Sequence, residues 1–297
     1  MSATSLLRRM LLAELLFYAL VSLLLQRYAG WSPAATLWLA LGLALAGRAL
    51  CIKVTYVYAV LYRSPPPQEI GYLRWLFEGW REFAHFCLLF SLIQPWEGLF
   101  LRRDAKPQPG RPALLLVHGY QCNRGFWWWL APRLRARGCN VATLSLTPVH
   151  AGIDDYVDQV AARIEVLCRD AGCDRVVLVG HSMGGLVARA YLRRCGHGRV
   201  AKLVTLGTPH HGSELAHLGL GRNARQMQPD SAWLAQLAAT PVAVPCVALY
   251  SPHDNYVMPQ ASARLEGAQV VCLPGLGHLA MSASPAVLEA VAAAAGV

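Results

Sequence analysis

The pattern of apolar and polar positions divides the chain into two parts. From Arg111 onward, short apolar runs rich in Val and Leu alternate with longer segments of helical periodicity. Continuous apolar strands separated by helices are typical of a parallel sheet covered by helices on both faces. We therefore predict an α/β domain over 111–297, with a mostly parallel sheet of about six strands. The expected strands are 113–117, 141–146, 175–179, 202–206, 244–250 and 269–273, and the expected helices are 127–137, 156–170, 186–194, 232–238, 260–265 and 285–294.

The N-terminal region follows a different pattern, in which two long apolar runs come close together. The first run covers 10–25 with Glu14 and Ser22 as its polar positions, and the second covers 34–46. Each core is slightly short of the about 20 residues that span a bilayer, but nearby Arg and Lys side chains can reach the interface. No convincing small-residue cleavage site follows the first run, which argues against a signal peptide. We predict a two-helix membrane anchor over 1–63, with buried or interfacial helices as the alternative.

The distribution of basic residues predicts how such an anchor is oriented. Arg8 and Arg9 precede the first run, Arg48 begins a group of basic residues around and after the second, and Arg27 lies in the short loop between. Because Lys and Arg accumulate on the cytoplasmic side, both ends of the anchor and the α/β domain are predicted to be cytoplasmic, at a membrane of the bacterial inner-membrane type. Nine cysteines without a Cys-x-x-Cys pair agree with a reducing compartment.

The segment over 64–110 connects the two parts. The stiff break Ser64-Pro65-Pro66-Pro67 marks a boundary, and 70–100 then places aromatic residues at helical spacing among charged ones. This pattern predicts an amphipathic helix that lies either on the membrane or against the downstream domain. A polar, proline-rich linker follows over 102–110.

Composition narrows the class of function. Hydrophobic residues make up 55% of the 297 positions and charged residues 15%, which is more apolar than an ordinary soluble domain and agrees with membrane-embedded segments. The net charge of +10 is compatible with binding to nucleic acid. However, the arginines are scattered along the chain, and no zinc-finger spacing or aromatic-interleaved basic motif occurs. We therefore expect no nucleic-acid partner, and a basic protein beside an anionic membrane surface fits better.

The strongest chemical signal is the stretch Val176–Gly185. Four apolar β-formers lead into Gly-His-Ser-Met-Gly, and a helical segment follows. A sharp turn from strand to helix tolerates only small neighbours, which explains Gly180 and Gly184, and it exposes the Ser182 hydroxyl beside a helix N-terminus. An incidental serine in a glycine-rich turn is the alternative. The strand before and the helix after favour a nucleophile.

A serine nucleophile needs a base and a group that orients the base. His278 follows the expected strand 269–273 after a glycine-containing turn, and Asp254 follows 244–250. Because functional groups gather at the carboxyl ends of parallel strands, both are expected to meet Ser182. The alternatives are a capping or surface histidine and an aspartate that caps its own loop. The order Ser, Asp, His along the chain agrees with this type of elbow.

The oxyanion that forms during attack needs backbone donors. We expect one from the amide of Met183, directly after the nucleophile, and one from the amide of Tyr120, which Gly119 turns toward the site. A simple turn at the end of the strand is the alternative for this glycine, and the two interpretations are compatible.

Two further stretches carry weaker signals. The loop Gly207–Ser213 contains His210 and His211, but no carboxylate or cysteine completes a metal-ligand set, so we predict a pocket wall and no metal. The aromatic run Phe126–Trp129 either lines an acyl pocket or packs against the sheet and the preceding helix.

Together these motifs resemble the α/β-hydrolase superfamily and, within it, bacterial lipases and esterases. The resemblance covers about 111–297 and implies hydrolysis of esters through an acyl-enzyme, without a metal or an organic cofactor. The N-terminal region differs from the secreted members, since a membrane-type extension stands where they carry a cleavable signal. The matching features are Val117-His118-Gly119-Tyr120, Gly180-His181-Ser182-Met183-Gly184-Gly185, Gly207-Thr208-Pro209-His210-His211-Gly212, Gln226-Met227-Gln228-Pro229, Asp254 and Gly277-His278.

The sequence therefore predicts a membrane-anchored serine hydrolase that cleaves carboxylic esters resembling acyl lipids. Ser182 attacks, His278 transfers the proton, Asp254 holds the imidazole, and the Tyr120 and Met183 amides bind the oxyanion. The expected partners are an acyl ester substrate and the lipid bilayer, with the oligomeric state left open. The alternatives are an acyltransferase or thioesterase on the same fold, and a non-catalytic membrane adaptor.

Overall fold

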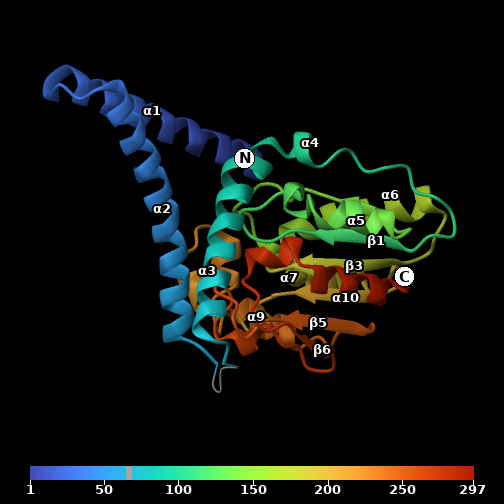
Figure 1. Cartoon of the computed structure of the whole chain (residues 1–297). Coiled ribbons are helices and arrows are strands. Elements are labelled where there is room, and N and C mark those ends of the chain that lie inside the picture. The colour runs from blue at the N-terminus through green and yellow to red at the C-terminus, as the bar shows by residue number, and fades with distance from the viewer. Residues whose placement is uncertain (65–68) are drawn as a thin grey trace.

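The computed structural model describes residues 1–64 and 69–297, and within them a six-stranded parallel sheet forms the centre (Figure 1). The strands lie in the order β2-β1-β3-β4-β5-β6, and every neighbouring pair is parallel. This arrangement confirms the predicted fold class. The strands are β1 (Ala113–Val117), β2 (Asn140–Thr143), β3 (Val176–His181), β4 (Val200–Leu206), β5 (Cys246–Tyr250) and β6 (Gln269–Cys272).

Helices cover both faces of this sheet. Neighbouring residues of a strand point to opposite faces, so Leu115 belongs to one buried cluster with α6 and α7, and Leu114 belongs to another with α5 and α10. The expected helix 260–265 is only a short 3₁₀ turn, whereas most other boundaries shift by a few residues. The elements are η3 (Arg124–Trp127), α5 (Leu130–Ala136), η4 (Ile153–Tyr156), α6 (Val157–Ala171), α7 (Met183–Cys195), η5 (Glu214–Leu218), α8 (Arg222–Gln226), α9 (Ala232–Ala238), η6 (Gln260–Ala263), η7 (Leu279–Ala283) and α10 (Pro285–Ala295).

The N-terminal runs form a hairpin of two long helices, α1 (Ala3–Ala29) and α2 (Pro33–Leu61). Gly30 ends α1 in the left-handed conformation, and the Ser32 hydroxyl caps α2 by accepting from the Ala35 amide at 3.2 Å. The most apolar 18-residue windows have mean hydropathies of 1.6 and 1.8 and are 0% and 11% buried. By length and composition both helices can cross a membrane, and the tip of the hairpin projects away from the sheet (Figure 1).

The next helical segment lies where an amphipathic helix was expected over 70–100, but its regular part is shorter. Helix α3 (Tyr72–Cys87) lies beside α2 and is followed by a π turn, η1 (Leu88–Ile93), by η2 (Gln94–Trp96) and by the short α4 (Glu97–Phe100). One face of α3 is buried against the α/β part of the chain, and the other exposes Phe77 and Trp80. Of the proline-rich break, Pro65, Pro66 and Pro67 lie outside the described residues.

This arrangement places the loops that follow the strands next to the N-terminal helices. The arrowheads of the labelled strands point toward α3 in Figure 1, with α2 beyond it. Side chains at the carboxyl ends of the strands therefore lie between the sheet and the N-terminal helices.

Candidate active site

Ser182 lies in a sharp turn between β3 and α7. Its backbone has φ 55° and ψ −126°, a region that non-glycine residues rarely occupy and that the surrounding structure must hold in place. The turn is tight enough that a Cβ at Gly180 would lie 2.5 Å from the Gly185 nitrogen, and one at Gly184 would lie 2.2 Å from the Val117 oxygen. These contacts explain why the glycines predicted beside the serine are needed.

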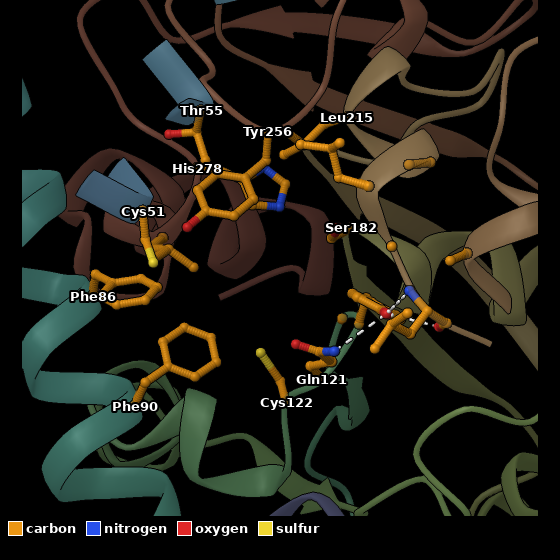
Figure 2. Close-up of a pocket in the computed structure, with 18 of the residues that line it drawn as sticks. Cys51, Thr55, Phe86, Phe90, Gln121, Cys122, Ser182, Leu215, Tyr256 and His278 are labelled. Carbon is orange, nitrogen blue, oxygen red and sulfur yellow. Dashed lines mark hydrogen bonds between the residues drawn. The ribbon is translucent and has the colours of Figure 1, made fainter. Parts of the chain in front are cut away.

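Asp254 and His278, which follow β5 and β6, meet as a buried pair. The Nδ1 of His278 donates to the Oδ2 of Asp254 at 2.7 Å. The other carboxylate oxygen accepts from the amides of Tyr256 and Val257 at 2.7 and 2.9 Å, so Asp254 caps its own loop and holds the imidazole at once. This bond leaves Nε2 as the free ring nitrogen, and His278 lines the same cavity as Ser182 (Figure 2).

The loop that carries His278 is held by a hydrogen-bond chain from the N-terminal hairpin. The amide of His278 donates to the Oδ1 of Asn255 at 3.2 Å, and the Nδ2 of Asn255 donates to the hydroxyl of Thr55 in α2 at 2.8 Å. The Tyr256 ring stacks on the imidazole with centroids 5.0 Å apart. Sequence reasoning missed Thr55, because a threonine within an apolar helix gives no local sign of a partner far along the chain.

Glu82 of α3 holds the same loop from the other side. Its fully buried carboxylate accepts from the amides of Leu279 and Ala280, at 2.7 and 3.0 Å, directly after His278. Gly277 permits this approach, since a Cβ there would lie 2.4 Å from Oε2. Burial raises the pKa of Glu82 to about 7. Sequence reasoning missed this residue too, although a carboxylate on the buried face of an amphipathic helix was a signal that could have indicated it.

The loop after β1 lies against the serine. A Cβ at Gly119 would lie 2.8 Å from the Cβ of Ser182. Beneath it, the Nδ1 of His118 donates to the Gly119 carbonyl at 2.9 Å and its Nε2 accepts from the Leu146 amide at 2.9 Å. Burial lowers the pKa of His118 to about 4, so the ring stays neutral and its two hydrogen bonds stiffen the loop.

The two residues expected to supply oxyanion donors lie in the vicinity of Ser182. Met183 is the first residue of α7, and Tyr120 lines the cavity that contains the serine. The Tyr120 hydroxyl donates to the Leu220 carbonyl at 2.7 Å and accepts from the Leu220 amide at 2.7 Å. The side chain of Tyr120 thus fastens a loop beside the cavity, while the role of its amide stays a prediction.

His181 packs directly beneath the Asp254–His278 pair. Its ring stacks on Phe126 with centroids 4.2 Å apart and lies 4.5 Å from the ring of His278. Its Nε2 donates to the His278 carbonyl at 3.2 Å. Burial, with a smaller effect from the neighbouring His278, holds the pKa of His181 well below its ordinary value, so this ring remains neutral.

The paired histidines after β4 separate into different surroundings. His210 is buried, with its ring nitrogens 3.1 Å from the Thr205 hydroxyl and 3.3 Å from a guanidinium nitrogen of Arg189. Within residues 1–64 and 69–297, no group of three or more His, Cys, Asp or Glu side chains is placed to hold a metal. The loop reaches the cavity through Pro209, as a pocket wall would.

The aromatic run beside the β1 loop packs in the interior. Phe126 and Trp127 are fully buried in the cluster between the sheet, α5 and η1. None of the side chains in 126–129 lines the cavity of Ser182. Of the two interpretations of this run, the structure therefore favours packing over an acyl pocket.

Comparison with known proteins places part of the chain among lipase-like sequences. Residues 152–239 match a family model described as a PGAP1-like alpha/beta domain. The chain is 32% identical over 114 residues to a triacylglycerol lipase of Pseudarthrobacter phenanthrenivorans, covering 36% of this chain and 35% of that protein. A triacylglycerol lipase of Burkholderia plantarii is 32% identical over 114 residues, covering 36% and 32%. The match spans about a third of the length of these curated relatives.

Solved structures agree on the fold. A Bacillus licheniformis lipase in its mature form superposes with a TM-score of 0.58 at 20% identity, covering 66% of this chain and 96% of that one. Lipase B of Aspergillus fumigatus gives a TM-score of 0.57 at 17% identity, covering 67% and 55%. The chain therefore has the α/β-hydrolase fold, and its sequence is similar to lipases over part of that fold.

Proposed function

We propose that this chain is a membrane-anchored serine hydrolase that cleaves carboxylic esters of acyl lipids. The observation that carries the proposal is the convergence of Ser182, in its strained turn, with the buried Asp254–His278 pair at one edge of the sheet. Similarity to triacylglycerol lipases over part of the chain supports an ester as the substrate.

The geometry suits an acyl-enzyme mechanism. His278 donates through Nδ1 to Asp254, so its Nε2 accepts the Ser182 proton as Oγ attacks the ester carbonyl. The Tyr120 and Met183 amides bind the oxyanion, and the alcohol leaves with the proton from the imidazolium. Water then attacks the acyl-serine, gives its proton to His278, and the carboxylic acid departs as serine recovers the proton.

Membrane attachment rests on the N-terminal hairpin. Its helices are long enough to span a bilayer, and their outer faces are exposed and apolar. We assign 1–63 to the anchor, 64–110 to the amphipathic helix and linker, and 111–297 to the catalytic domain. The basic residues flanking both outer ends of the hairpin support a cytoplasmic catalytic domain at a membrane of the bacterial inner-membrane type.

Labelling with a fluorophosphonate probe tests the nucleophile in the full chain purified in detergent. The wild type is expected to be labelled and to hydrolyse p-nitrophenyl esters, whereas Ser182→Ala loses both and stays folded by circular dichroism. The matched control, Ser5→Ala in α1, keeps both. An unlabelled wild type would favour the adaptor, and transfer of the acyl group to added alcohols or thiols in preference to water would favour the acyltransferase.

A further inference from the structure

The cavity beside Ser182 extends onto the N-terminal helices. It measures about 720 Å³, which is within the range of about 300–1,000 Å³ for small-molecule pockets. Figure 2 shows Cys51, Phe86 and Phe90 on the side opposite Ser182. These residues come from α2, α3 and η1, and α1 adds further apolar lining from 6–11. Much of the wall therefore comes from segments that precede the α/β domain.

Hydrogen bonds connect the elements that form this wall. The Arg48 guanidinium in α2 donates to both carboxylate oxygens of Glu14 in α1, at 2.7 and 2.9 Å, and its Nε donates to the Ser91 hydroxyl of η1 at 2.9 Å. The Arg48 guanidinium thus joins three of the four elements that form the wall, α1, α2 and η1. Glu14, Arg48 and Ser91 line the cavity themselves but are bonded to one another. Apart from the Thr55 hydroxyl, the other side chains of this wall are apolar, which suits an apolar ligand and not a charged one.

The cavity opens to the surface where the side chains that line it are exposed. Met10 of α1 is 58% exposed, Leu218 at the end of η5 is 54% exposed, and Leu220, two residues further on, is 66% exposed. Leucines and aromatics on the outer faces of α1 and α2 continue this apolar rim. Exposed apolar area of this extent marks a surface that contacts lipid or a partner, and the neighbouring helices are long enough to span a bilayer.

We propose that this cavity is an acyl-chain site filled from the bilayer. One fatty acyl chain of a membrane lipid enters between Met10 and Leu218, lies along the wall formed by α1, α2, α3 and η1, and places its ester carbonyl at Ser182. The proposal rests on the function proposed for Ser182 and names the ligand and the route of the same site. It makes the N-terminal helices part of the substrate site.

Two glycines of α2 provide a matched test. A Cβ at Gly47 or at Gly42 would meet no heavy atom within 4 Å, but of the two only Gly47 lines the cavity. We expect Gly47→Trp, in the full chain reconstituted in phosphatidylcholine nanodiscs, to lower kcat/KM for p-nitrophenyl palmitate by at least about tenfold. The loss for p-nitrophenyl acetate, whose short acyl group leaves most of the cavity empty, is expected to be much smaller. The control Gly42→Trp, outside the lining, is expected to leave both esters within about twofold.

A second variant and its control, both on α1, keep the proposal testable if Gly47→Trp fails to fold. Met10→Trp fills the mouth and is expected to repeat the selective loss, whereas Leu12→Trp, exposed but outside the lining, does not. Equal loss for both esters, or unchanged palmitate turnover in both cavity variants, would overturn the proposal while leaving Ser182 as the nucleophile. If the wild type hydrolyses neither ester, the proposed function fails. Binding of a fluorescent long-chain fatty acid then still tests whether the cavity holds an acyl chain. Of the four variants, only Gly47→Trp and Met10→Trp should weaken that binding.

Discussion

The carboxylate of Glu82 accepts a hydrogen bond of 2.7 Å from the amide of Leu279, the residue that follows His278. The partners are 197 positions apart, and the acceptor belongs to a helix that precedes the α/β domain. A buried carboxylate with two amide donors fixes the position of the backbone that carries them. The orientation of the candidate base therefore depends on docking of the N-terminal segment.

Helix α2 makes a second link of the same kind. Thr55 reaches the amide of His278 through Asn255, so the loop is held from α2 and from α3 together. The N-terminal helices thus have two connections to the site, one through the cavity wall and one through the loop that carries the base. A chain cut at residue 111 would lose both connections.

We expect Glu82→Ala to lower kcat more than it raises KM. The substitution leaves two buried amides without an acceptor, at a cost of about 1–3 kcal/mol each, and frees the His278 loop. A loss of about ten- to hundredfold in kcat on p-nitrophenyl acetate is expected, with KM within about twofold, because Glu82 acts through His278 and does not touch the substrate. Steady-state kinetics of the full chain in detergent measures both constants.

Glu82→Gln separates the hydrogen bonds from simple packing. Glutamine has nearly the same volume and keeps one carbonyl acceptor, so it should recover part of the lost kcat. An alanine variant with wild-type kcat would show that the two amide contacts do not position the base.

The hydroxyl of Thr55 provides a second test of the same dependence. Thr55→Val keeps the shape of the side chain but removes the acceptor for Asn255, leaving a buried amide donor unsatisfied. We expect kcat on p-nitrophenyl acetate to fall by about five- to tenfold and Thr55→Ser to restore it.

Thr36→Val in the same helix is the control for Thr55→Val. The Thr36 hydroxyl is also hydrogen-bonded, to the Pro33 carbonyl at 2.9 Å, but it lies near the tip of the hairpin. Equal kinetics for the Thr55 and Thr36 variants would contradict a positioning role for Thr55.

Local patterns predicted the elements that carry the candidate triad. The apolar strand of β3 and the glycines after it located Ser182, and the positions directly after β5 and β6 located Asp254 and His278. The strand positions agree with the structure, and because a parallel sheet brings its carboxyl ends to one edge, the residues that follow these strands lie near one another whatever the intervening helices contain.

Local sequence patterns could not predict the contacts between the N-terminal helices and the site. Thr55 pairs with a residue 200 positions away, and neither end of that hydrogen bond differs from any other polar residue in the sequence. The aromatic run 126–129 has a composition that suits a pocket and a core equally. This run packs between the sheet and η1 because the N-terminal segment folds back onto the α/β domain. The local periodicity of the sequence gives no information about that long-range packing.

Glu82 also makes the folding stability of the protein depend on pH, and its burial sets the sign of that dependence. Its pKa is raised from 4.5 to about 7, mainly because burial disfavours the charged form, while the two amide donors act in the opposite direction. Between these values the folded protein binds more protons at this site than the unfolded chain does. The contribution of Glu82 to stability is therefore largest below pH 4.5 and decreases as the pH rises toward 7.

Comparison with Glu82→Gln isolates this effect, because glutamine does not ionise while the remaining titrating groups are shared. We expect the free energy of unfolding of the wild type, relative to Glu82→Gln, to fall by about 3 kcal/mol between pH 4.5 and pH 7.5. Denaturant unfolding of both proteins in the same detergent at several pH values measures the difference. A difference that rises with pH would mean that the amides of Leu279 and Ala280 outweigh burial, and that Glu82 holds the base loop as a stable carboxylate at every pH in this window.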